Sequence, residues 1–68
     1  MHFQIETEQE DDGRWIAEIP QLPGVMVYAN SREVAVLRVQ SLALRVLAEK
    51  LDHGEPIPEL DTVFSLAA

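Results

Sequence analysis

The feature that most constrains this sequence is one long helical segment in a very short chain. Ser31 is a candidate N-cap for it, and Gly54 followed by Pro56 marks its end. A helix over residues 32–53 is about 33 Å long at roughly 1.5 Å per residue. A globule of 68 residues has a radius of gyration of roughly 11 Å, so the helix crosses its whole width. The rest of the chain must therefore pack against this helix.

Apolar side chains cover most of the circumference of the predicted helix. One arc has the spacing of a stripe that faces a sheet; it consists of Ala35, Val36, Val39, Leu42, Ala43, Val46 and Leu47. Beyond this arc Leu37, Leu44 and Leu51 recur every seven residues and lie in one row along the axis, next to Ala48. One small sheet can cover only one face of the helix. We expect the leucine row to be covered either by the end of the same chain or, as we favour, by another copy of it.

Two segments before the helix have the pattern of a β-hairpin. Residues 2–9 alternate between apolar and polar side chains, which is the period of a half-buried strand. Residues 10–13 end in Asp-Gly, a strong hairpin signal. Residues 14–19 then form the returning strand, with Trp15 and Ala17 on the same face.

A third strand is predicted over residues 25–29, after a break at Pro20 to Gly24. Val25 and Val27 lie on one of its faces, and Met26 and Tyr28 lie on the other. A strand that is apolar on both faces is expected to be covered on both.

The predicted order of elements is β-β-β-α-β, in a single domain over residues 1–68. After the helix, Pro56 to Pro58 forms a stiff connector, and residues 62–66 are expected to form a short final strand anchored by Phe64 and Leu66. The fold class is therefore α+β: a three-stranded antiparallel sheet, one long helix and a short final strand. Hydrophobic residues make up 47% of the chain and cysteine is absent, so self-association or docking onto a partner is expected to complete the small core.

The charge balance bears on the kind of partner. Twelve acidic and five basic side chains give a formal net charge of −7. This sign opposes binding to phosphate backbones and suits a basic protein. The first residues show no basic and then apolar leader, and no apolar run has the length of a membrane span, so a cytoplasmic protein that contacts neither nucleic acid nor membrane is expected.

The residues that commonly carry catalysis are few. His2 and His53 are the only histidines, and Ser31 is better explained as a helix cap than as a nucleophile. The acidic run at Asp11 and Asp12 does not have the spacing of a calcium loop and is better explained as a solvated turn. We expect no enzyme activity, no metal and no cofactor.

One combination of motifs resembles a known family. Residues 12–25 read DGRWIAEIPQLPGV, and a short strand and the helix start NSREVA at residues 30–35 follow. This arrangement resembles the HicB-like antitoxin family, in which an aromatic and apolar strand, a Pro-x-Leu-Pro-Gly loop and a Ser/Thr-capped helix follow one another. The resemblance covers roughly residues 3–55. Val34 departs from it, because a second glutamate is usual at that position.

The resemblance implies a partial ribonuclease-H-like fold and neutralisation of a small basic mRNA-cleaving toxin of the HicA type. Residues 1–68 do not include the C-terminal DNA-binding domain that typical members carry, so operator binding is not expected of this chain. The alternative is an orphan homo-oligomeric domain of the same fold, with a scaffolding or ligand-binding role and no toxin partner.

Two sets of residues are therefore candidates for binding surfaces. Self-association into a dimer or tetramer is expected to involve Leu37, Leu44, Leu51, Met26 and Tyr28. Binding of a protein partner is expected to involve Asp11, Asp12, Trp15, Leu22 and Pro23.

Overall fold

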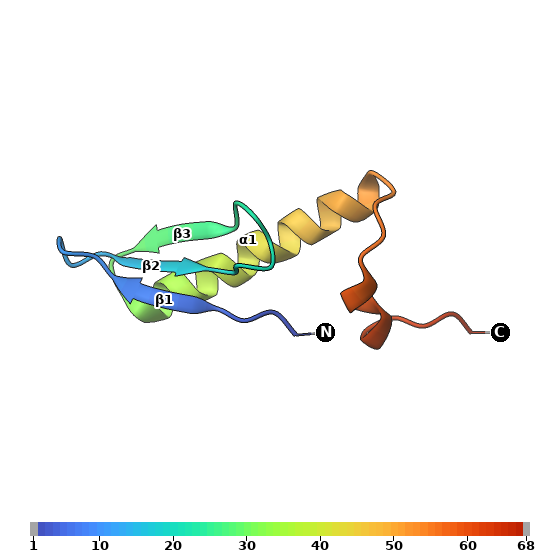
Figure 1. Cartoon of the computed structure of the whole chain (residues 1–68), viewed down its shortest axis with the longest axis horizontal. Coiled ribbons are helices and arrows are strands. Elements are labelled where there is room, and N and C mark those ends of the chain that lie inside the picture. The colour runs from blue at the N-terminus through green and yellow to red at the C-terminus, as the bar shows by residue number, and fades with distance from the viewer. Residues whose placement is uncertain (1, 68) are drawn as a thin grey trace.

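A three-stranded sheet lies on one half of a long helix in the computed structural model, which describes residues 2–67 (Figure 1). The strands β1 (Glu6–Gln9), β2 (Trp15–Glu18) and β3 (Met26–Ala29) form an antiparallel meander in the order β1-β2-β3. The helix α1 (Arg32–Asp52) covers one face of this sheet. The α+β class and the order of three strands and a helix are as the sequence predicts.

The turn between β1 and β2 and the loop between β2 and β3 lie at opposite ends of the sheet (Figure 1). Each contains a glycine with positive φ, at 92° for Gly13 and 85° for Gly24, where a side chain would strain the backbone. In the second loop Leu22 N–H donates to the Ile19 carbonyl, and Val25 N–H donates to the Leu22 carbonyl. These bonds pair backbone N–H and carbonyl groups in a loop where the two prolines interrupt the pairing of the strands.

The helix begins and ends where its capping residues predict. Ser31 has an extended backbone, and its Oγ accepts a hydrogen bond from Val34 N–H at 3.2 Å. At the other end Gly54 adopts φ 78°, and its N–H donates to the Leu51 carbonyl.

The core lies between the sheet and the predicted apolar stripe of α1. Its buried members are Ala17, Ile19, Leu22, Val25, Ala29, Ala35, Val39, Ala43 and Leu47. Phe3, Ile5, Trp15 and Val27 pack at its border, as the alternation in the three strands predicts. Only one face of the sheet is thus covered by the described residues.

The final strand predicted over residues 62–66 does not form. The chain makes a 3-10 helix, η1 (Pro58–Thr62), and residues 64–67 have no regular secondary structure. The reason lies in the lengths: the 21 residues of α1 span about 31 Å, whereas four residues of a strand span about 13 Å. The second half of α1 therefore runs past the sheet and releases the chain beyond it (Figure 1). There, Val63 and Phe64 donate their N–H groups to the Leu60 carbonyl instead of pairing with a strand.

The first strand is also shorter than predicted. Pairing begins at Glu6, opposite Glu18, because Ile19 already bonds to Val25 and Pro20 ends the second strand. Residues 2–5 keep the alternating burial of a strand, with Phe3 and Ile5 half-buried, but they lack a paired neighbour.

Candidate protein-binding surfaces

The outer face of the sheet carries an apolar patch with a border of carboxylates. Cross-strand pairing places Ile16 opposite Tyr28, and Glu18 opposite Met26. Met26 is 44% exposed and Tyr28 is 41% exposed, and no described element covers this side of the sheet. We call this surface the outer sheet face, and it consists of Ile16, Met26, Tyr28, Glu6, Glu8 and Glu18.

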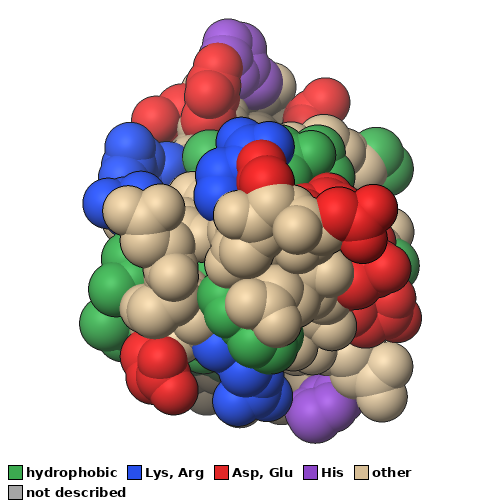
Figure 2. Space-filling model, turned by 90° about the vertical axis from the view of Figure 1, so that its left-hand side faces the viewer, with side chains coloured by type: hydrophobic (Ala, Val, Ile, Leu, Met, Phe, Trp, Pro, Cys, Tyr) green, Lys and Arg blue, Asp and Glu red, His purple; other side chains and the backbone are tan. Residues whose placement is uncertain are grey.

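The carboxylates of the outer sheet face come from β1 and β2. Glu6 lies directly opposite Glu18, and Glu8 lies directly opposite Ile16. Like charges on directly opposite residues destabilise a sheet. Within residues 2–67 none of these three carboxylates forms an ion pair. Figure 2, which views the hairpin end, shows one group of acidic side chains along the right-hand side of the molecule, where no basic side chain lies among them, and further acidic side chains at the top and lower left.

The basic side chain of Arg14 lies at one end of this face. The guanidinium carbon of Arg14 lies 4.7 Å from the centre of the Tyr28 ring, within the range of a cation–π contact. Arg14 Nε also donates to Asp12 Oδ2 at 2.8 Å, and Arg14 N–H donates to Asp12 Oδ1 at 3.0 Å. These bonds, the backbone one first, lower the pKa of Asp12 from its ordinary value of 3.8.

The residues that the sequence proposed for partner binding are not gathered in one place. Asp11 and Asp12 lie in the exposed β1–β2 turn, whereas Pro23 is exposed in the loop at the opposite end of the sheet. Trp15 packs against the core from the helix side, and Leu22 is only 7% exposed. Trp15 and Leu22 are thus chiefly core residues.

The residues proposed for self-association are divided between two faces. Leu37, Leu44 and Leu51 lie in a row along α1, outside its buried stripe, and are 68%, 63% and 47% exposed. Residues 54–67, the described part of the chain after the helix, do not cover this row, so the expectation that the end of the same chain covers it is wrong. Met26 and Tyr28 lie instead on the outer sheet face, across the whole thickness of the domain.

The acidic border of the outer sheet face was not among the binding residues predicted from the sequence. The alternation in residues 2–9 already placed Glu6 and Glu8 on the side away from Phe3. The missing information was the register, because only pairing brings Glu6 beside Glu18 and Glu8 beside Ile16.

Sites for other ligands are not evident in the described part of the chain. Residues 2–67 contain no cluster of three or more His, Cys, Asp or Glu side chains that could hold a metal ion. Nor does this range contain a helix with the length and apolar character needed to cross a membrane. No protein-family model, curated protein or solved structure matches this chain.

Proposed function

We propose that this chain is an antitoxin-like protein-binding module that neutralises a small basic mRNA-cleaving toxin of the HicA type. The outer sheet face is the surface that we assign to this partner. The observation that carries the proposal is the combination on one uncovered surface of an apolar centre and unpaired carboxylates. The sequence resemblance to HicB-like antitoxins supplies the class of partner.

The chemistry of this face favours a basic protein. Met26 and Tyr28 offer apolar and aromatic area that a partner can desolvate, and aromatic side chains are enriched at the centres of interfaces. Glu6 and Glu18 repel each other in the free chain. A lysine or arginine of the partner placed between them would remove that repulsion and would steer the encounter. A messenger RNA would meet the same carboxylates unfavourably, so contact with the toxin and not with its substrate is proposed.

Co-expression tests this function. Cells that express a HicA-type toxin should stop growing, and the intact chain should restore growth and copurify with the toxin. A Met26→Glu and Tyr28→Glu double variant should lose both effects while keeping its helical circular dichroism. A Leu37→Glu and Leu51→Glu double variant, which adds the same two negative charges on the opposite side of the domain, should keep them. If the intact chain does not bind the toxin, the proposed toxin partner is wrong. If both variants lose growth rescue and copurification equally, the outer sheet face is not the specific binding surface.

A second candidate is a homo-oligomeric domain with a scaffolding role and no toxin. The exposed leucine row on α1 favours it, because three leucines this exposed on one helix face are typical of an interface. A stable assembly of the pure chain together with no toxin binding would favour this candidate. In either case the proposed compartment is the cytoplasm.

A further inference from the structure

The end of the chain forms an apolar arm that its own domain leaves uncovered. The C-terminal arm is defined as residues 58–67, which follow Ile57, the last residue packed against the core. Beyond η1, Val63 is 52%, Phe64 is 69% and Leu66 is 100% exposed. In Figure 1 the arm descends from the far end of α1 and stands apart from the sheet.

The dimensions of the molecule reflect this separation. The radius of gyration is 14.1 Å and the longest extent is 53 Å. A compact domain of this length would have a radius of gyration of roughly 11 Å. The connector explains the geometry, because Pro56 and Pro58 restrict the backbone on both sides of Ile57. This connector directs the arm away from the domain that it leaves, so the arm is available to a second copy.

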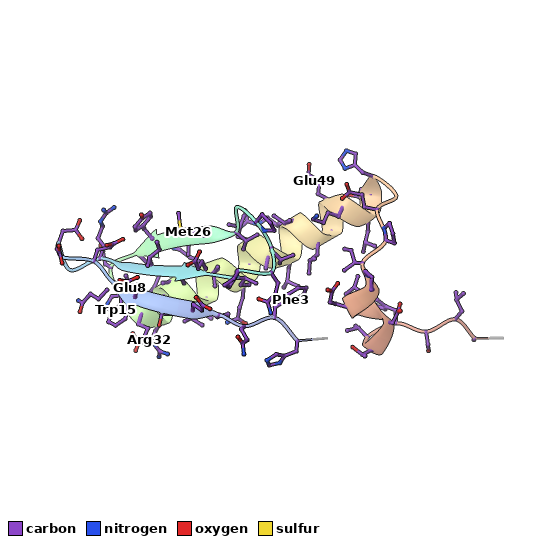
Figure 3. The ribbon with its side chains drawn as sticks, in the orientation of Figure 1. Phe3, Glu8, Trp15, Met26, Arg32 and Glu49 are labelled. Carbon is purple, nitrogen blue, oxygen red and sulfur yellow. The ribbon has the colours of Figure 1, made fainter. Side chains whose placement is uncertain are left out.

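An apolar groove runs between α1 and the first residues of the chain. This side groove is lined by Phe3, Ile5, Ile19, Ala43, Leu44 and Leu47, with Gln40 as its one polar member. None of the described residues of the arm lines it. Pro58 and Glu59 of the arm line a neighbouring hollow together with Phe3 and Leu47. Figure 3 labels Phe3 between the sheet and the descending arm.

The distribution of charge on the chain favours a second copy as the partner for the side groove. Two copies of this chain each carry a formal charge of −7, so they repel each other unless they meet through uncharged surfaces. The lining of the side groove contains no charged side chain, and residues 62–67 of the arm contain none either. The outer sheet face, by contrast, is bordered by carboxylates and is unsuited to a second acidic copy.

We propose that two copies exchange their C-terminal arms, so that Phe64 and Leu66 of each copy lie in the side groove of the other. The exchange is reciprocal and closes as a two-fold dimer. Every contact is then made twice, and an aromatic ring such as Phe64 can bury about 150–250 Å² each time. Because both arms are buried, the total buried area is doubled, and in this way a short arm can approach the roughly 1,200 Å² that specific interfaces bury. Leu44 serves as groove wall, while Leu37, which lies outside the groove, is not part of this contact.

Sedimentation equilibrium of the full chain gives the first test. The intact chain should have a mass of about 15 kDa at micromolar concentration, twice its chain mass of 7.6 kDa. Phe64→Asp and Leu44→Glu should each give the monomer mass, and Leu37→Glu should remain dimeric. A monomeric intact chain, or a Phe64→Asp variant that stays dimeric, overturns the proposal.

Cross-linking gives the second test, because the chain has no cysteine of its own. A variant with Leu44→Cys and Phe64→Cys should form disulfide-linked dimers on oxidation, as the exchange brings the two positions together between copies. Leu37→Cys with Phe64→Cys, and Leu44→Cys alone, should stay monomeric on a denaturing gel. An internally linked monomer would show that each arm folds onto its own groove, and a dimer from Leu44→Cys alone would show that the leucine rows pair directly. Either result overturns the exchange, and so does a double variant that forms no disulfide.

Discussion

The guanidinium carbon of Arg14 lies 4.7 Å from the centre of the Tyr28 ring while Arg14 Nε donates to Asp12 at 2.8 Å. This pair connects the hairpin turn to the outer sheet face. Arg14→Ala removes the side-chain bond and leaves the backbone N–H of residue 14 in place. Because that backbone bond is the largest cause of the low pKa of Asp12, the pKa should return only part of the way to 3.8. An NMR titration of the Asp12 carboxyl carbon measures this, and full return to the ordinary value would contradict it.

Asp12 should also contribute to the pH dependence of stability. Its pKa is lower in the folded chain than in the unfolded chain, so ionised Asp12 stabilises the fold above about pH 3.8. This contribution should be lost as the pH falls through the lowered folded pKa. Asp12→Asn lacks the contribution at every pH, so the difference in urea midpoint between the two chains should shrink in acid. A difference that is constant from neutral to acid pH would count against this role.

Removal of the helix cap should destabilise the domain. Ser31→Ala deletes the acceptor for Val34 N–H and should lower the free energy of unfolding by about 1 kcal/mol. Ser41→Ala is the matched control, because Ser41 is exposed in the middle of α1, and it should change stability by no more than about 0.5 kcal/mol. Urea unfolding followed by circular dichroism compares the two. Equal effects would mean that the cap contributes nothing specific.

The centre of the core should be sensitive to the loss of two methyl groups. Val39 is completely buried between α1 and the sheet, and Val39→Ala should cost about 2 kcal/mol. Val34→Ala removes the same atoms from an exposed position of the same helix and should cost less than about 0.5 kcal/mol. Urea unfolding compares the two variants, and Val39→Ala should have its midpoint at a much lower urea concentration than Val34→Ala. Equal midpoints would contradict this expectation.

Local sequence patterns predicted most of this fold because each is decided by neighbouring residues. The Ser31 cap, the Gly54 stop and the strand alternation were all correct for this reason. The final strand was wrong because a strand depends on a partner as well as on its own alternation, and α1 carries residues 62–66 away from both edges of the sheet. The acidic border of the outer sheet face was missed because it depends on register between strands.

The carboxylates of the outer sheet face should oppose stability and favour partner association. Glu18→Gln removes the repulsion from Glu6 and should stabilise the free domain by about 0.2–1 kcal/mol. The same substitution should slow association with a basic toxin at low salt and leave dissociation nearly unchanged. Asp11→Asn combined with Asp12→Asn tests whether the turn also steers the partner, with the same expected effect on the two rates. Stopped-flow and unfolding measurements on the same samples give both quantities, and a destabilised Glu18→Gln variant would contradict the argument.

The most direct test of the proposed function is to map, by NMR, the residues whose signals change when a HicA-type toxin binds. Amide and side-chain NMR signals of the labelled chain should be followed as unlabelled toxin is added. If the outer sheet face binds the toxin, the largest signal changes should fall on Ile16, Met26 and Tyr28, with small changes at Leu37 and Leu51 on the opposite side of the domain. Changes confined to the helix, or none at all at saturating toxin, would contradict it.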